Sequence, residues 1–434
     1  MRQKHAVQLS LHHQIPEEHE VGRKLAIISR WLDDQPGLFE QVGREIGIDK
    51  TTGRPGLSAE SALRCGLLLQ MDNLAYRELE FRLQDSVCYR AFARIEKETP
   101  VFSTLHSAIS RISQQTWEAL TQAVVASARA EGLERCRRIR IDSTVTETHI
   151  SPPRDSQMLV DAVRVMQRLA AHAPTTERWP DRLRRARRRH LEIAGNLRRA
   201  QRQKKYRDLV KVVVEQRLRL VALIEQMRGV DPLWVVEAER WVPLIDQVLE
   251  QTRRRVFEGQ QVPADEKLLS LFETHTDLIV KAPRKTAFGH KLNLTTGTSG
   301  LVLDVVVERG NPADADRLMP MVERHQQHYG IIPYALAVDG GYASRANLAQ
   351  AKALGVKQVA FHKRRGIPVE DMTSSPWVYR QLKRFRAGIE ACISYLKRCF
   401  GLSRCLWKGW THFKRYVHSA VACHNLLVYA QLRG

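Results

Sequence analysis

The sequence lacks the marks of a membrane protein and of a disulfide-stabilised protein. It contains no run of about 18 apolar residues, which a membrane-spanning helix needs. Its first residues, MRQKHAVQLSLHHQIPEEHE, have no apolar stretch typical of a secretion signal. The seven cysteines are an odd number and form no C-x-x-C pair, which favours reduced thiols over a disulfide framework or a zinc ribbon. We therefore expect a cytoplasmic protein with no membrane partner.

The sequence is also short of acids. It has 47 Asp and Glu against 69 Lys and Arg, and so a net charge of +22 at pH 7. Apolar residues make up 43% of the chain, which excludes a disordered basic tail. Such an excess of positive charge indicates a polyanionic partner. Because the basic residues are spread over several segments rather than one amphipathic helix, nucleic acid is favoured over an acidic membrane surface.

Three regimes of composition divide the first part of the chain. Residues 1–135 show helical spacing, with Ser58 as an expected N-cap, and predict a domain that either binds DNA or only docks on the next domain. Residues 136–151 alternate and are rich in Ile, Val and Thr, which predicts a strand. Residues 152–262 return to helix, with twelve Lys or Arg and two acids between positions 180 and 207. We favour a basic face laid along a phosphate backbone over an ordinary solvated face.

The remaining residues, 263–434, alternate between strand and helix patterns. The simplest account is one mixed α/β domain with a central sheet, formed by residues 136–151 and 263–434 and interrupted by the helical insertion 152–262. The expected strands lie within 267–281, 288–296, 301–309, 331–339 and 356–366, and the expected helices span 311–330, 344–355 and 379–401.

One acid stands out near the C-terminus. From residue 372 to residue 434, Glu390 is the single acid among eleven Lys and Arg. Helical spacing places it on one face with Arg386 and Lys397, with Lys383 extending the row. Glu390 either forms an ordinary ion pair with Arg386 or binds a metal, since a lone carboxylate among phosphate-binding cations opposes DNA unless a divalent cation bridges it.

Two further acids lie in or after strand patterns. Asp339 ends the apolar run ALAV and is followed by two glycines, which suits a metal or phosphate site at the carboxyl end of a strand, or an ordinary Asp-Gly turn. Asp142 lies late in IRIDST, with the opposite parity to its neighbouring isoleucines. Three carboxylates from two strands and a helix can converge at one sheet edge and hold hard divalent cations. The acids that compete for this role are Glu147, Asp155, Asp304 and Glu308.

This set of motifs resembles the bacterial insertion-sequence transposases with a ribonuclease H-like DDE catalytic core and, among them, the ISNCY family. The motifs that carry the likeness are IDSTVTETHI, PRDS, FGHK, GNPAD, DGGY and FRAGIEACISYLKR. In related transposases the last helix carries a Y-x2-R-x3-E-x6-K pattern. Arg386, Glu390 and Lys397 match its R, E and K, and Lys383 stands at the position of the tyrosine.

The resemblance implies a ribonuclease H-like mixed sheet flanked by helices, with Asp142, Asp339 and Glu390 as catalytic acids. These acids would hold two Mg²⁺ ions, which Mn²⁺ can replace. The implied activity is cleavage at the terminal inverted repeats of an insertion sequence, followed by strand transfer of the freed 3′-hydroxyl into target DNA. The implied partners are double-stranded DNA and at least one further copy of the chain on that DNA, at the bacterial nucleoid.

The resemblance also assigns DNA contacts. Lys383, Arg386 and Lys397 would position the phosphates that flank the scissile bond. His290 and Lys291 of the FGHK motif would line the DNA groove, with packing as an equal alternative for His290. Two other activities stay open: a catalytically inactive, repressor-like DNA-binding protein, and a metal-dependent nuclease that cuts DNA without joining it.

Overall fold

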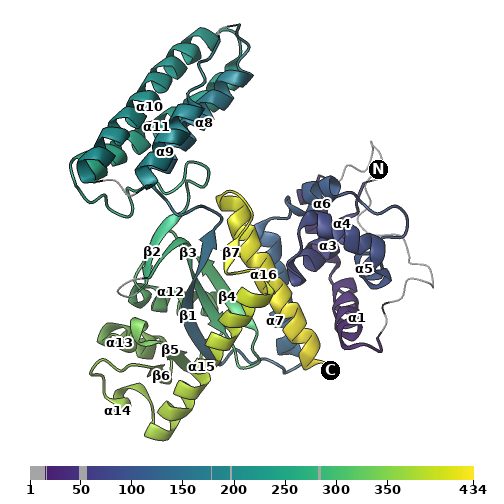
Figure 1. Cartoon of the computed structure of the whole chain (residues 1–434). Coiled ribbons are helices and arrows are strands. Elements are labelled where there is room, and N and C mark those ends of the chain that lie inside the picture. Colours follow the sequence, from purple (N-terminus) through teal and green to yellow (C-terminus); the bar gives the residue numbers. More distant parts are fainter. Residues whose placement is uncertain (1–14, 16, 48–55, 177, 196–197, 282–284) are drawn as a thin grey trace. The chain divides into compact units, whose positions relative to one another are not determined.

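The computed structural model describes residues 15, 17–47, 56–176, 178–195, 198–281 and 285–434 (Figure 1). Contacts divide the chain into two compact units, residues 1–147 with 290–434, and residues 148–289. Among the described residues, no helix has both the length and the apolar character needed to cross a membrane.

The first unit is built on a mixed sheet with β1 at its centre. Its strands are β1 (Arg138–Thr148), β3 (Lys285–Thr296), β4 (Val302–Val307), β5 (Ala335–Val338), β6 (Gln358–Phe361) and the short β7 (Arg404–Cys405). β1 lies between β3 and β5, β6 pairs with β5, β4 pairs with β3, and β7 pairs with β1. The expected mixed α/β fold, a mixed sheet flanked by helices, is confirmed.

Three strands of this sheet run parallel, and β5 and β6 end level with Ile141 of β1, beyond which β1 continues to Thr148. In the register, Ile141 of β1 pairs with Val338 of β5, and Val338 pairs on its other side with Phe361 of β6. The residues that follow these three therefore begin the same edge of the sheet. Asp142 and Asp339 are two of them. Ligands of open α/β sheets bind at such a carboxyl edge.

Five described helices of the first unit follow the strands along the chain. They are α12 (Asp314–Tyr329), α13 (Arg345–Leu354), α14 (Val369–Met372), α15 (Pro376–Cys399) and α16 (Trp410–Leu432). α15 contacts β5 and β6, and α13 contacts β6. Ser375 begins α15, because its side chain accepts a hydrogen bond from the backbone N–H of Val378 and Pro376 occupies the first helical position. The expected helices at 311–330, 344–355 and 379–401 are thus confirmed within a few residues.

The N-terminal helices share one hydrophobic core with the sheet. They are α1 (Glu20–Asp33), α2 (Pro36–Glu45), α3 (Ala59–Met71), α4 (Tyr76–Asp85), α5 (Val87–Ala93), α6 (Phe102–Ile109) and α7 (Gln114–Ala130). α1, α3 and α7 pack against α16. The expected N-cap is confirmed, since the Ser58 side chain accepts a hydrogen bond from Ser61 N–H. A DNA-end-binding role for residues 1–135 stays a prediction.

The second unit has its own hydrophobic core, formed by a helical bundle. Its elements are α8 (Asp155–His172), α9 (Leu183–Ala194), α10 (Arg199–Met227), α11 (Pro232–Thr252) and β2 (Asp277–Lys281). The expected strand within 267–281 is confirmed only for its last five residues, those of β2. The apolar residues before it are buried for a different reason, because Leu268 and Leu271 pack into the core of the bundle.

Candidate active site

The site begins with the two faces of β1. Ile139 and Ile141 are fully buried on one face, while Arg140 and Asp142 share the other because side chains alternate along a strand. The Asp142 side chain is 15% exposed. Its Oδ1 accepts a hydrogen bond from the backbone N–H of Ser143 at 2.8 Å. Burial raises the pKa of Asp142, and the positive charge of Arg386 opposes that rise.

Helix α15 brings Arg386 and Glu390 to this acid. Arg386 is buried on the helix, in line with Leu382 and Ile389, and it also contacts Glu390 one turn further on, with which we expected it to share a face. Its long apolar stem follows the buried stripe, and its guanidinium reaches the carboxyl edge of the sheet.

The guanidinium of Arg386 contacts all three candidate acids. One terminal nitrogen lies 2.9 Å from Asp142 Oδ2 and 3.8 Å from Asp339 Oδ1. The other donates to Glu390 Oε1 at 2.6 Å. The ion pair between Arg386 and Glu390 that we considered is therefore present, and the same cation also joins acids that are far apart in the sequence. Asp142 is the most buried of the three acids, whereas Glu390 is 62% exposed.

The donors at this site suit a hard divalent cation, although they do not form a closed metal cluster. Among the described residues, no group of three His, Cys, Asp or Glu side chains lies close enough together to hold a metal ion. Asp142, Asp339 and Glu390 offer only carboxylate oxygens, the donor type that Mg²⁺ prefers. They surround a positive charge, which Arg386 supplies in this structure. In charge and donor type, the three acids fit a divalent ion.

A buried arginine fixes α15 against β1. Arg140, two residues before Asp142, donates from Nε to Thr296 Oγ1 at 2.8 Å and from Nη1 to the backbone oxygen of Phe385 at 2.7 Å. Its guanidinium also lies 4.7 Å from the centre of the Phe385 ring. A Cβ atom on Gly388 would lie 2.1 Å from Arg140 Nη1, so this close approach needs a glycine. Sequence reasoning missed both residues; a charge inside an apolar strand and a glycine inside a helix were the available signals.

Two of the residues expected to contact DNA are not exposed. His290 is fully buried, with its ring centre 4.6 Å from that of Trp410 and 4.8 Å from that of Phe413. Lys291 is 5% exposed, and its Nζ contacts Asp314 Oδ1 at 2.5 Å and the backbone oxygen of Pro312 at 2.7 Å. In this structure His290 packs among aromatic rings, the alternative that we left open, and Lys291 forms an internal ion pair; the expected groove-lining role stays a prediction. The FGHK motif lies within β3, a strand that pairs with β1 along one edge and with β2 and β4 along the other.

The other two cations expected to contact DNA lie on α15. Lys383 is half-buried, with its ammonium 5.8 Å from the centre of the Tyr379 ring. Lys397 is half-buried in the last turn of the helix. Their assignment to phosphate binding stays a prediction.

The four competing acids are held in ion pairs elsewhere. Arg404 pairs with Glu147, Arg255 with Asp155, Arg324 with Asp304, and Arg317 with Glu308. None of these four ion pairs includes Asp142, Asp339 or Glu390. The convergence of acids on Arg386 therefore sets Asp142, Asp339 and Glu390 apart from them.

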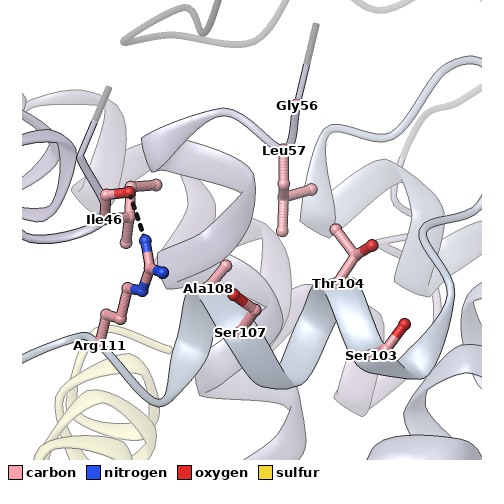
Figure 2. Close-up of a pocket in the computed structure, with 8 residues that line it drawn as sticks. All are labelled: Ile46, Gly56, Leu57, Ser103, Thr104, Ser107, Ala108 and Arg111. Carbon is pink, nitrogen blue, oxygen red and sulfur yellow. Dashed lines mark hydrogen bonds between the residues drawn. The ribbon is translucent and has the colours of Figure 1, made fainter. Parts of the chain in front are cut away.

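A cavity of about 230 Å³ lies in the N-terminal helical part of the first unit (Figure 2). The Arg111 side chain lines it and donates to the backbone oxygen of Ile46 at 3.2 Å. Hydroxyl groups of Ser103, Thr104 and Ser107 on α6 face the same space. None of the described residues that line this cavity is an acid, so they offer no carboxylate ligands for a metal ion.

Two models of known protein families match parts of this chain. Residues 259–426 match the family model described as a transposase DDE domain, a range that includes Asp339 and Glu390. Residues 9–113 match a second model, described as a transposase domain (DUF772). Neither the comparison with curated proteins nor that with solved structures found a match. Together the two domains support a DNA transposase of the insertion-sequence DDE class.

Proposed function

We propose that this protein cleaves DNA at the terminal inverted repeats of an insertion sequence and joins the freed ends to target DNA, as a member of the ISNCY family. The observation that carries the proposal is the meeting of three acids, from β1, the end of β5 and α15, at one guanidinium. A chain with a net charge of +22 has little reason to gather carboxylates at a sheet edge unless they serve chemistry.

In this proposal Asp142, Asp339 and Glu390 hold two Mg²⁺ ions, with Mn²⁺ as a possible replacement. When bound, such ions activate the attacking oxygen and stabilise the leaving oxygen of a phosphodiester. The protein's part is to supply ionised carboxylates at fixed positions. Burial raises the pKa of Asp142, and Arg386 counteracts this, so the guanidinium helps to keep the acid ionised.

Arg386 has a second part in the proposal. Its single positive charge offsets part of the negative charge of the three acids, which would otherwise repel one another more strongly. Glu390 is the most exposed of them and lies on the same helix, so its carboxylate can turn from Arg386 toward a metal with little change elsewhere. Arg386, Lys383 and Lys397 are then available to position the phosphates on either side of the scissile bond.

The partners that follow are double-stranded DNA, both the element ends and the target, and a second copy of the chain, because two ends must be held together for joining. The basic helices of the second unit are a further candidate DNA surface. Arg184, Arg187 and Arg188 of α9 are exposed, and no acid of the described residues pairs with them, whereas Arg185 and Arg189 pair with Asp208 of α10.

The proposal is tested by variants that keep the shape of each acid. Asp142→Asn, Asp339→Asn and Glu390→Gln should each reduce Mg²⁺-dependent cleavage and joining of end-containing DNA to background, with DNA binding retained. Glu147→Gln is the matched control, because Glu147 lies on β1 as well but pairs on the surface with Arg404. It should leave both reactions unchanged.

The results separate the competing functions. Normal cleavage and joining by Glu390→Gln in Mg²⁺ would refute the assignment of the site. Cleavage without joined products from the unaltered protein would instead indicate a nuclease. DNA binding without cleavage in either Mg²⁺ or Mn²⁺ would indicate a repressor-like protein.

A further inference from the structure

A basic turn begins beside the candidate acids, at the end of β6. The backbone N–H of His362 donates to the oxygen of Val338 at 2.9 Å, which extends the pairing of β6 with β5 by one residue. His362 therefore stands next to Asp339 on the carboxyl edge. The three residues after it, Lys363, Arg364 and Arg365, are all exposed. We refer to residues 362–365 as the HKRR turn.

The backbone of the HKRR turn is tightly bent. Arg365 and Gly366 have φ angles of +48° and +81°, and the N–H of Ile367 donates to the oxygen of Arg364 at 3.1 Å. Ile367 is 4% exposed, so the chain returns to the hydrophobic core directly after the turn. The cations are therefore held at the sheet edge by a fixed backbone at each end and not by a long loop.

Lys363 packs closely against the residue that follows Asp339. A Cβ atom on Gly340 would lie 2.6 Å from Lys363 Cβ and 3.2 Å from its Cγ. Gly340 does not have a positive φ angle, so the glycine is needed here for space and not for backbone conformation. The stem of Lys363 thus lies directly against the backbone beside a candidate metal ligand.

Tyr379 of α15 connects the HKRR turn to Lys383. Its hydroxyl donates to the backbone oxygen of Phe361 at 2.9 Å, and the ammonium of Lys383 lies 5.8 Å from its ring centre. The charge of Arg364 opposes the rise that burial causes in the pKa of Tyr379, so Arg364 also lies near this phenol. Within the described residues, no acid forms an ion pair with Lys363, Arg364 or Lys383.

We propose that Lys363 and Arg364, with Lys383, bind the phosphate backbone of DNA next to the scissile phosphodiester. Three cations without acidic partners, beside the acid at the end of β5, form a strip that suits successive phosphates of one strand. Phosphate contacts of this kind fix the position of the DNA strand and carry no base-sequence information. Its place beside the scissile bond rests on the proposed function of Asp339.

The test compares two lysines that flank the β-strand β6 at its opposite ends. Lys363 follows β6, and Lys357 immediately precedes it; both are exposed. Binding of a fluorescein-labelled random-sequence DNA duplex to the full chain is measured in EDTA over a range of salt concentrations. Lys363→Gln should weaken binding and reduce the slope of log K against log salt by about 0.9, the value for one lost phosphate contact. Lys357→Gln should change neither, although it removes the same charge.

Gly340→Ala tests whether the position of Lys363, and not only its charge, matters for DNA binding. It keeps every cation but forces the stem of Lys363 to move, so it should also weaken binding. Equal effects of Lys363→Gln and Lys357→Gln, or unaltered binding by Gly340→Ala, would overturn the proposal. If Lys363→Gln unfolds at a lower temperature than the unaltered protein, Arg364→Gln replaces it in the same comparison.

The test also separates this proposal from the proposed function. The binding measurement needs no metal and no cleavage, and it should give the same differences in an Asp142→Asn background. On a cleavable substrate, Lys363→Gln should raise KM more than it lowers kcat, since a phosphate contact made before and during the reaction contributes to both states. Cleavage that is lost in the acid variants but unaffected by Lys363→Gln would refute only the basic site.

Discussion

The close contact of Arg140 with Gly388 predicts that Gly388→Ala changes the free energy of unfolding in opposite directions in the presence and in the absence of the Arg140 side chain. In the unaltered protein, a Cβ atom at residue 388 would lie 2.1 Å from Arg140 Nη1 and 2.9 Å from its Cζ. The guanidinium must then move and lose its 2.7 Å hydrogen bond to the oxygen of Phe385. A hydrogen bond from a charged group contributes about 1.5–3 kcal/mol. Alanine in place of glycine within a helix regains about 1 kcal/mol.

Gly388→Ala should therefore lower the free energy of unfolding by about 0.5–2 kcal/mol. With Arg140→Ala already present, the guanidinium that would clash with the new Cβ atom is gone. The same substitution should then raise the free energy of unfolding, by up to about 1 kcal/mol. Urea unfolding of the four full-length proteins of this cycle measures both steps.

Two results would refute the reasoning. Gly388→Ala that stabilises the unaltered protein would show that the guanidinium does not lie over this glycine. Equal effects in both backgrounds would show that residues 140 and 388 are not coupled. Because Glu390 lies two residues beyond Gly388 on α15, we also expect Gly388→Ala to raise the Mg²⁺ concentration needed for half-maximal cleavage.

Three further predictions concern other buried titratable groups. Burial lowers the pKa of His424 to about 4 from a usual 6.5, so the histidine takes up a proton on unfolding. The free energy of unfolding should therefore fall by about 3 kcal/mol as the pH drops from about 6.5 to 4. His424→Gln should flatten that decline, measured by urea unfolding. Arg64→Met removes the 3.0 Å partner of the buried Glu60 but leaves Arg94 at 3.5 Å, and it should lower the free energy of unfolding by about 1–3 kcal/mol, measured likewise. Arg386→Gln should move the acid limit of Mn²⁺ binding to higher pH, because the raised pKa of Asp142 rises further without the guanidinium; Mn²⁺ titrations at several pH values measure this.

Each of these predictions has a contrary result. The His424 reasoning fails if the variant and the unaltered protein lose stability in parallel between pH 7 and pH 4. A loss below about 1 kcal/mol for Arg64→Met would mean that Glu60 finds water or another partner. An acid limit that is unmoved in Arg386→Gln would show that Asp142 does not govern Mn²⁺ binding.

Much of the fold could be predicted from the sequence because its signals are local. Ser58 and Ser375 begin helices by accepting a hydrogen bond from a backbone N–H two or three residues inside. The strand ALAV and the acid after it also follow from local pattern and from the rule for parallel sheets. The resemblance to known transposases then selected Asp142, Asp339 and Glu390 from several acids, which local pattern alone left open.

What the sequence concealed depends on contacts between distant residues. The sequence analysis did not predict the burial of Arg386, although the residue has the spacing of the buried stripe from Leu382 and Ile389. His290 and Lys291 looked available for DNA because their motif is polar, yet they lie in a strand covered on both sides. A polar side chain is buried where a partner exists, and neither the rings around His290 nor Asp314 beside Lys291 is near in the sequence.

The long excursion between β1 and β5 has a consequence for biosynthesis. Arg138 pairs with Ala335, so a strand that leaves the ribosome early waits for its neighbour until almost two hundred further residues have been translated. Glu390 is translated later still, and α16, which covers α3 and α7, comes last. A frameshift or stop codon anywhere before α15 would yield a product without Glu390. Under the proposed function, gene copies damaged in this way should therefore not cleave DNA.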